Sequence, residues 1–75
     1  RARKALIVGS GFIGVEIALL LRRLRLEVTL IEMADKVIPA MLDHETAEIV
    51  LGLIQGQGIR VLLNAKVIAF LGNSR

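Results

Sequence analysis

The chain has 75 residues, of which 55% are hydrophobic, none is cysteine, and the formal net charge is +3. This length allows at most one small domain, and the apolar content exceeds the roughly 45–50% of ordinary soluble domains, so we interpret the chain as part of a larger protein or an obligate partner of other chains. The lack of cysteine excludes disulfides, thiolate zinc sites and thiol redox chemistry in these residues, and no apolar stretch approaches the roughly 20 residues of a membrane span.

The first half of the chain predicts a strand, a helix and a second strand. Residues 5–8 form a short apolar run that ends at Gly9, which is typical of a strand buried on both faces. A helix is expected from 12 to 24, with apolar residues at helical spacing. Its apolar positions are Ile13, Ile17, Leu20, Leu21 and Leu24, with Gly14 and Ala18 on an adjoining face. Residues 27–31 are rich in β-branched types and predict a second strand.

The second half predicts a helix between two further strands. After an irregular stretch that holds Pro39, Asp43 is a plausible N-cap, and the helix that follows should end near Gly56 or Gly58. This helix would direct inward Ala47, Val50, Leu51 and Ile54. Strands are then expected at 59–63 and 66–71.

Alternating strands and helices with short connections predict a parallel sheet with right-handed crossovers. We therefore predict an α/β, Rossmann-like three-layer fold of βαβαβ type with strand order 3-2-1, which is half of a dinucleotide-binding fold. Strand 66–71 follows too closely for a helical crossover and should begin an antiparallel β-excursion. Residues 1–75 are then a partial NAD(H)-binding domain, incomplete by itself.

Three glycines lie between the first strand and the first helix. Gly9, Gly11 and Gly14 match G-x-G-x-x-G, and Glu32 ends the second strand. In such a motif the first glycine permits the tight turn, the second lets the backbone approach a pyrophosphate, and the third lets the helix pack close to the sheet. The alternative is a glycine-rich turn with an ordinary solvated acid.

We expect the loop to bind a nicotinamide dinucleotide. The free N–H groups near the helix start would meet the phosphates, and Glu32 would accept hydrogen bonds from the adenosine ribose. A 2′-phosphate beside Glu32 would meet like charge, and no arginine occupies 33–35, with Lys36 the nearest cation. The sequence therefore favours NAD over NADP. The expected cofactor-binding residues of the loop and strand are Gly9, Ser10, Gly11, Phe12, Ile13, Gly14 and Glu32.

Four stretches resemble the NAD-binding domain of FAD-dependent pyridine nucleotide–disulfide oxidoreductases, above all the NADH oxidase, NADH peroxidase and coenzyme A disulfide reductase branch. They are LIVGSGFIGVEIALLL, VTLIEMADKVIP, LDHETAEIV and GIRVLLNAKV. The resemblance implies that the parent protein passes hydride from NADH to FAD and onward to a disulfide, peroxide or oxygen. It also implies FAD and dimerisation domains outside this chain, a homo-oligomeric parent and a cytoplasmic location. The 75 residues themselves would carry no catalytic residue and no metal site.

The resemblance implies a role for three further residues, and at a fourth the chain departs from the family's pattern. Phe12 stands where relatives place an aromatic gate to the flavin, and ordinary packing is its alternative. Glu16 matches a cofactor-side carboxylate that pairs with a lysine of the FAD domain; otherwise it is an acid favoured by the helix dipole. Met41 matches a loop residue near the cofactor, although apolar cover for the second helix is the simpler interpretation. Arg25 stands where the family usually has a glycine in a left-handed helix cap, which puts that cap in doubt.

The sequence leaves several other functions open. A nucleotide-sensing regulatory domain of the potassium-transport type shares the glycine motif, but it usually carries an aspartate at the ribose position and lacks the counterpart of Glu16. An FAD-binding half-domain and a purely structural βαβ module are further alternatives. Nucleic-acid binding is disfavoured because the cations are split between the chain start and a helix end, without interleaved aromatic residues. His44, the sole histidine, is expected to be a surface residue.

Overall fold

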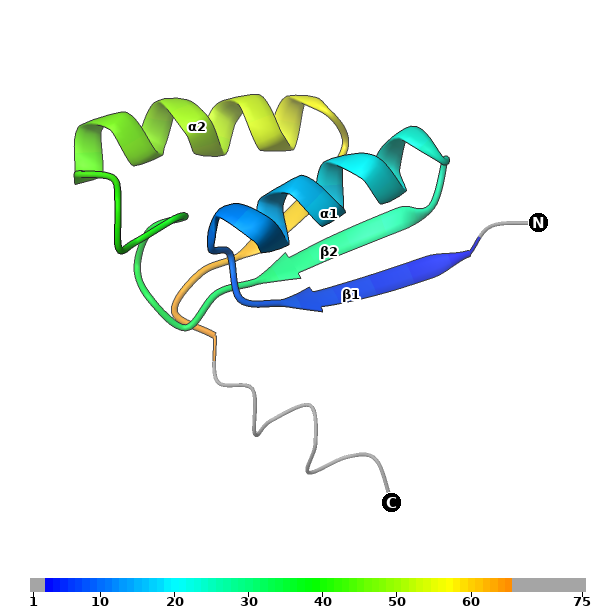
Figure 1. The fold of residues 1–75 in the computed structure, drawn as a ribbon, viewed down its shortest axis with the longest axis horizontal. Coiled ribbons are helices and arrows are strands. Elements are labelled where there is room, and N and C mark those ends of the chain that lie inside the picture. Colours follow the sequence, from blue (N-terminus) through cyan, green and yellow to red (C-terminus); the bar gives the residue numbers. More distant parts are fainter. Residues whose placement is uncertain (1–2, 66–75) are drawn as a thin grey trace, which may run out of the picture.

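A computed structural model describes residues 3–65 of the chain, and the predicted strand 66–71 lies outside this range. Figure 1 shows the elements in chain order: β1 (Lys4–Val8), α1 (Phe12–Arg23), β2 (Glu27–Ile31), α2 (His44–Gly56) and β3 (Arg60–Leu62). All five elements predicted within this range are present, with ends that agree to within two residues. The α/β class is therefore confirmed.

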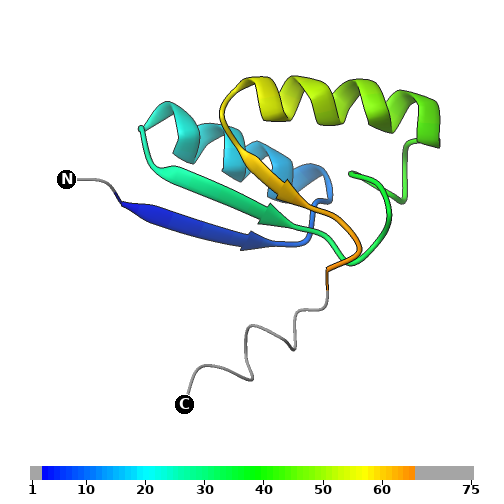
Figure 2. The same ribbon diagram turned by 180° about the vertical axis from the view of Figure 1, so that it is seen from behind.

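The three strands form one parallel sheet in the order β1-β2-β3, which is the predicted order 3-2-1 counted from the other edge. The register aligns Val8 with Ile31 and Ile31 with Leu62, so the carboxyl ends of the strands lie at one edge of the sheet. Figures 1 and 2 show both helices on the same face of the sheet. The described residues thus form two layers, and the third layer of the predicted fold is not among them.

The hydrophobic core lies between the sheet and the helices. Alternation along the strands directs one set of side chains to this side, because successive residues of a strand point to opposite faces. The strand residues of this set are Ala5, Ile7, Val28, Leu30 and Val61. From α2, Ala47 and Ile54 are buried and Val50 and Leu51 are half-buried, which confirms the predicted inward face.

The side of α1 that faces the sheet is the one with Gly14 and Ala18, which agrees with the close packing predicted for the third glycine. The buried residues of α1 are Val15 and Ala18, whereas large apolar side chains of the predicted stripe remain exposed. Those exposed are Ile13, Ile17, Leu20 and Leu24. The helix is apolar around most of its circumference, so spacing alone could not select a face; the sheet takes the side with Gly14 and Ala18, where small residues permit close approach.

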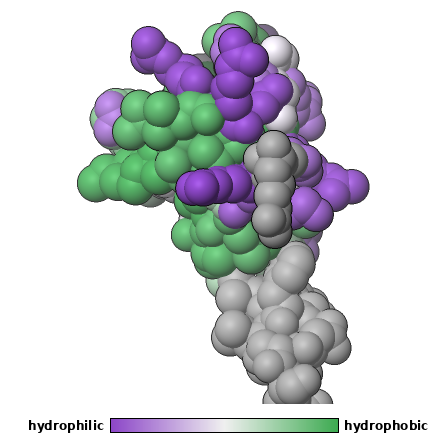
Figure 3. Space-filling view, turned by 90° about the vertical axis from the view of Figure 1, so that its right-hand side faces the viewer, coloured by the Kyte–Doolittle hydropathy of each residue, from purple (hydrophilic) through white to green (hydrophobic). Residues whose placement is uncertain are grey.

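Exposed apolar surface extends beyond α1. On the sheet face away from the helices, Leu6 and Val8 of β1 are exposed. Figure 3 shows apolar side chains gathered into a broad continuous area on one side of the molecule, next to polar ones. This agrees with the expectation that the chain carries more apolar surface than it covers. Within residues 3–65, no helix has the length and apolarity to cross a membrane.

Candidate functional site

The candidate site begins where β1 passes through the glycine loop into α1. Gly9 has φ +97°, a left-handed conformation that side chains rarely adopt, and its N–H donates to the Ile31 carbonyl at 2.6 Å. A Cβ atom at Gly14 would overlap the carbonyl oxygen of Gly9. The protein's own backbone therefore explains both the first and the third glycine of the motif.

Gly11 differs from the other two glycines. Its φ of −67° suits any residue, and a Cβ atom built on it meets nothing within 4 Å. It is the N-cap of α1 but supplies no side-chain hydrogen bond to the helix. Nothing among the described residues thus requires glycine here, and the absent side chain leaves open space in front of the helix.

Four residues at the start of α1 form what we call the loop mouth: Gly11, Phe12, Ile13 and Gly14. The first N–H groups of a helix have no partner within the helix, and those of Phe12, Ile13 and Gly14 donate to no other group among residues 3–65. Phe12 and Ile13 are 58% and 68% exposed. The loop mouth therefore presents unpaired amides and the positive end of the helix dipole, an arrangement that favours anions.

Glu32 follows β2 directly and lies against the glycine loop. Only 8% of it is exposed, and its carboxylate accepts three hydrogen bonds. Oε1 accepts from the backbone N–H of Ser10 at 2.7 Å and from the Ser10 hydroxyl at 2.7 Å, while Oε2 accepts from the N–H of Ala34 at 2.8 Å. Since Glu32 N–H also donates to the Leu62 carbonyl at 2.9 Å, both its backbone and its side chain are fixed.

These contacts decide the protonation state of Glu32. Burial acts to raise the pKa of its carboxyl group, but backbone and side-chain hydrogen bonds, led by those from Ala34 and Ser10, outweigh that effect. The pKa consequently lies below its ordinary value of 4.5. Near neutral pH the site therefore holds a buried negative charge beside the loop mouth.

The segment after Glu32 is held to the same loop. Val37 is fully buried, and the N–H of Ile38 donates to the Ser10 carbonyl at 2.8 Å. Ile38 has φ +44°, which for a β-branched residue costs on the order of 1–2 kcal/mol. Strain of this kind persists only where the surrounding contacts impose it, here the buried Val37 and the bond to Ser10.

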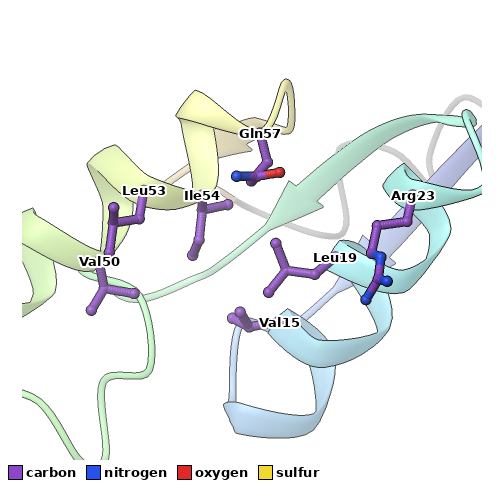
Figure 4. A pocket seen from close by; sticks show the side chains of 7 residues that line it. All are labelled: Val15, Leu19, Arg23, Val50, Leu53, Ile54 and Gln57. Atoms are coloured by element: carbon purple, nitrogen blue, oxygen red, sulfur yellow. The ribbon is translucent and has the colours of Figure 1, made fainter.

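Two hollows in the surface are candidate binding places for a dinucleotide. One, of about 600 Å³, is lined by the glycine loop together with Val8, Phe12 and Ile13. Figure 4 shows the other, an apolar groove of about 480 Å³ between α1 and α2, with only Arg23 and Gln57 as polar lining residues. The groove offers no row of backbone donors, whereas the hollow lies at the unpaired amides of the loop mouth and is therefore the better candidate.

Among residues 3–65, no hydrogen bond joins Glu32 to the remaining predicted site residues. Glu16 is exposed and lies in the second turn of α1, whose first turn holds no acid. The exposure of Phe12 and of Met41 (73%) shows that neither packs into the core of the described residues. His44 is at the surface, as expected, but its Nε2 lies 3.0 Å from Oδ2 of Asp35. No cluster of possible metal ligands occurs within residues 3–65.

Sequence reasoning placed Ser10 in the loop but missed its contact with Glu32. A serine between two glycines is ordinary in such a turn, and only the tertiary structure brings its hydroxyl to a residue 22 positions away. The bond from Ile38 to Ser10 was also missed, because isoleucine is not expected in a left-handed conformation.

The sequence profile of the family described as "Pyridine nucleotide-disulphide oxidoreductase" matches residues 4–75. Among curated proteins, an NADH oxidase from Methanocaldococcus jannaschii is 37% identical over 73 residues, which is 97% of this chain and 16% of the relative. The ferredoxin reductase component of a chlorobenzene dioxygenase from a Cupriavidus species is 36% identical over 99% of the chain and 18% of its own length. The chain thus spans less than a fifth of these relatives.

Solved structures share the fold. A NAD-dependent persulfide reductase from A. fulgidus is 48% identical with a TM-score of 0.81, covering 84% of this chain and 12% of that one. A water-forming NADH oxidase from Lactobacillus brevis, solved bound to NADH, is 25% identical with a TM-score of 0.79, covering 85% of this chain and 14% of that one.

Proposed function

Because the chain belongs to the pyridine nucleotide-disulphide oxidoreductase family, we propose that it binds NAD(H) at the loop mouth as the nicotinamide-nucleotide part of a flavin-dependent oxidoreductase. When bound, NADH supplies a hydride, which FAD held elsewhere in the parent protein accepts for onward transfer to a disulfide, peroxide or oxygen. The described residues of this chain hold the nucleotide and take no part in the chemical step.

The observation that carries the proposal is Gly11. The two neighbouring motif glycines are explained by backbone conformation and by close packing, whereas Gly11 has neither reason within residues 3–65. A pyrophosphate that approaches the unpaired amides of Phe12 and Ile13 would supply the missing reason. The residues present therefore fit the group that the family implies.

Glu32 supports the same assignment and favours NAD over NADP. Its carboxylate is ionised near neutral pH and fixed beside the loop mouth. A ribose hydroxyl can donate to it, whereas a 2′-phosphate would bring at least one further negative charge into a poorly solvated place. Of the cations, only Lys36 follows Glu32 within the next four residues.

The test uses ADP-ribose, which contains the pyrophosphate and the adenosine ribose but cannot transfer hydride. Titration calorimetry on the whole protein should show binding that weakens about 100-fold or more in Gly11→Val, because the new side chain occupies the space for the phosphates. Gly52→Ala is the matched control, since Gly52 is exposed on α2 with nothing near its Cβ position, and it should bind normally. Unchanged affinity in Gly11→Val would disprove the phosphate site.

A second measurement separates the oxidoreductase from a nucleotide-sensing domain without catalysis. The purified full-length protein should contain FAD, and its flavin absorbance should bleach on addition of NADH under anaerobic conditions. In Glu32→Arg, binding of ADP-ribose should weaken and the preference over 2′-phospho-ADP-ribose should narrow. Binding of ADP-ribose by a protein that contains no flavin would favour the sensing domain instead.

A further inference from the structure

All three polar groups of Ser10 join the glycine loop to the segment 32–38. Its N–H and its hydroxyl both donate to Oε1 of Glu32 at 2.7 Å, and its carbonyl accepts from Ile38 N–H at 2.8 Å. Ser10 has 0% exposure, so its hydroxyl is sealed from solvent and from any nucleotide at the loop mouth. Whatever this hydroxyl contributes to binding must therefore act through Glu32.

The acceptor capacity of the carboxylate shows what that contribution is. An ionised carboxylate has about four acceptor positions, two on each oxygen. Both acceptor positions of Oε1 are occupied by donors of Ser10, whereas Oε2 accepts one hydrogen bond, from Ala34 N–H at 2.8 Å. The acceptor position that remains for a ligand hydroxyl therefore belongs to Oε2.

We propose that Ser10 is a positioning residue that holds Oε1 of Glu32 and so leaves Oε2 as the acceptor for the adenosine ribose. The inference rests on the proposed NAD(H) binding and adds a determinant of selectivity to it. A carboxylate fixed at Oε1 cannot rotate away from an incoming 2′-phosphate. The hydroxyl of Ser10 thereby increases the preference for a free ribose over a phosphorylated one.

The charge on Glu32 supports this role. The leading influences on its pKa are burial, which raises it, and hydrogen bonds from Ala34 and Ser10, which lower it; none of them is a charged side chain. The other titratable groups of this segment are Asp35 and Lys36, and Asp35 is engaged at the surface by His44. Removal of the Ser10 hydroxyl should therefore raise the pKa of Glu32 towards its ordinary value.

The decisive experiment is a double-mutant cycle with Ser10→Ala and Glu32→Gln in the whole protein, titrated with ADP-ribose and 2′-phospho-ADP-ribose. Ser10→Ala removes one atom and keeps both backbone bonds of Ser10. We expect its affinity for ADP-ribose to fall about three- to tenfold, with a smaller loss for the phosphorylated ligand, because a bond to a charged group is lost. In the Glu32→Gln background the same change should leave the preference unaltered.

Thermal unfolding without nucleotide gives an independent measurement. The pKa of Glu32 is lower in the folded protein than in the unfolded chain. The ionised carboxylate therefore stabilises the folded protein at a pH above the unfolded-state pKa, and this stabilisation disappears as the pH falls through the folded-state pKa. The melting temperature of Ser10→Ala should therefore be lower than that of the unaltered protein near pH 7, and this deficit should shrink towards pH 3. A merely structural hydroxyl predicts the same deficit at every pH.

The outcomes separate the two proposals. Suppose that the unaltered protein binds ADP-ribose. If Ser10→Ala then leaves the preference for ADP-ribose over 2′-phospho-ADP-ribose unchanged, or changes it by the same factor with and without Glu32→Gln, the positioning role is wrong and the nucleotide site stands. A deficit in melting temperature that does not change with pH also contradicts it. If the unaltered protein binds neither ligand, both the nucleotide site and the role of Ser10 fail.

Discussion

The two helices begin with nearly the same backbone but with different side chains. The residue before α2, Asp43, has φ −76° and ψ 174°, and its carboxylate accepts from Thr46 N–H at 2.7 Å. The residue before α1, Gly11, has φ −67° and ψ 178° and offers no cap. An acid, Glu45, lies in the first turn of α2, whereas the first turn of α1 has none. Both helix starts could hold a capping side chain, and only one does.

The two helix starts differ in what they offer to an anionic ligand. The carboxylate of Asp43 occupies the Thr46 N–H, and together with Glu45 it places negative charge at the start of α2, which disfavours an anion there. At α1 the amides stay unpaired although the backbone would accept an aspartate or serine at Gly11 without contact to any neighbour. The missing cap is thus not imposed by the fold of residues 3–65, which supports a role in binding.

The largest expected effect comes from giving α1 the cap that α2 has. Gly11→Asp should lower the affinity for ADP-ribose by about 100-fold or more, since two like charges about 4 Å apart repel by about 4 kcal/mol in a partly solvated site. The same substitution should leave the melting temperature unchanged or slightly raised, because aspartate is a better N-cap than glycine. Calorimetric titration and thermal unfolding measure the two effects on one sample.

Gly11→Ser is the control for charge, since serine caps a helix without adding an anion. Its affinity should fall between those of the unaltered protein and Gly11→Asp. If both variants bind ADP-ribose normally, the contrast between the two helix starts has no bearing on the nucleotide.

A second contrast concerns one glycine inside each helix. Gly14→Ala should destabilise the protein by about 1–3 kcal/mol, because the new Cβ overlaps the Gly9 carbonyl and the helix must shift. Gly52→Ala should stabilise it by roughly 0.5–1 kcal/mol, since Gly52 has open space and alanine favours the helix. Urea unfolding measures the change in the free energy of unfolding for each variant. Changes of the same sign in the two variants would contradict the packing argument.

Most of the fold could be predicted because the local sequence signals for the starts and ends of its elements agree with one another. Gly9 ends β1, Asp43 starts α2, and Gly58 ends it at φ +90°, each for a reason visible in the sequence. Apolar spacing could not predict the face of α1, since a helix that is apolar nearly all round has no periodic preference, but the packing role of the third motif glycine indicated it. Only the close approach of Gly14 to Gly9 decides it.

The candidate site was predictable in part. The glycine motif and Glu32 could be found from spacing, because strands of a parallel sheet end at one edge. The Ser10–Glu32 bond and the strained Ile38 could not, since both depend on how the segment 33–42 folds back on the loop. That segment has no periodic pattern from which to predict it.

The ends of the two helices give a smaller effect. Both close with a left-handed residue, Gly58 after α2 (φ +90°) and Arg25 after α1 (φ +70°). At α1, Arg25 N–H donates to the Arg22 carbonyl at 2.9 Å, so the cap that the sequence put in doubt forms with a non-glycine residue. Arg25→Gly should therefore stabilise the protein by about 1 kcal/mol in urea unfolding, whereas Arg25→Ala, still a non-glycine residue, should not.

The smallest effect concerns the cap of α2 and depends on pH. Hydrogen bonds from Thr46 lower the pKa of Asp43, so its stabilisation is present above the unfolded pKa and is lost as the pH falls through the folded pKa. Asparagine caps a helix about as well but does not titrate in this range. Asp43→Asn should thus melt close to the unaltered protein at pH 7 and above it at pH 3, measured by circular dichroism. A difference in melting temperature between the two proteins that stays constant over this pH range would show that the α2 cap does not depend on the charge of Asp43. The contrast with α1 would then rest on hydrogen bonding alone.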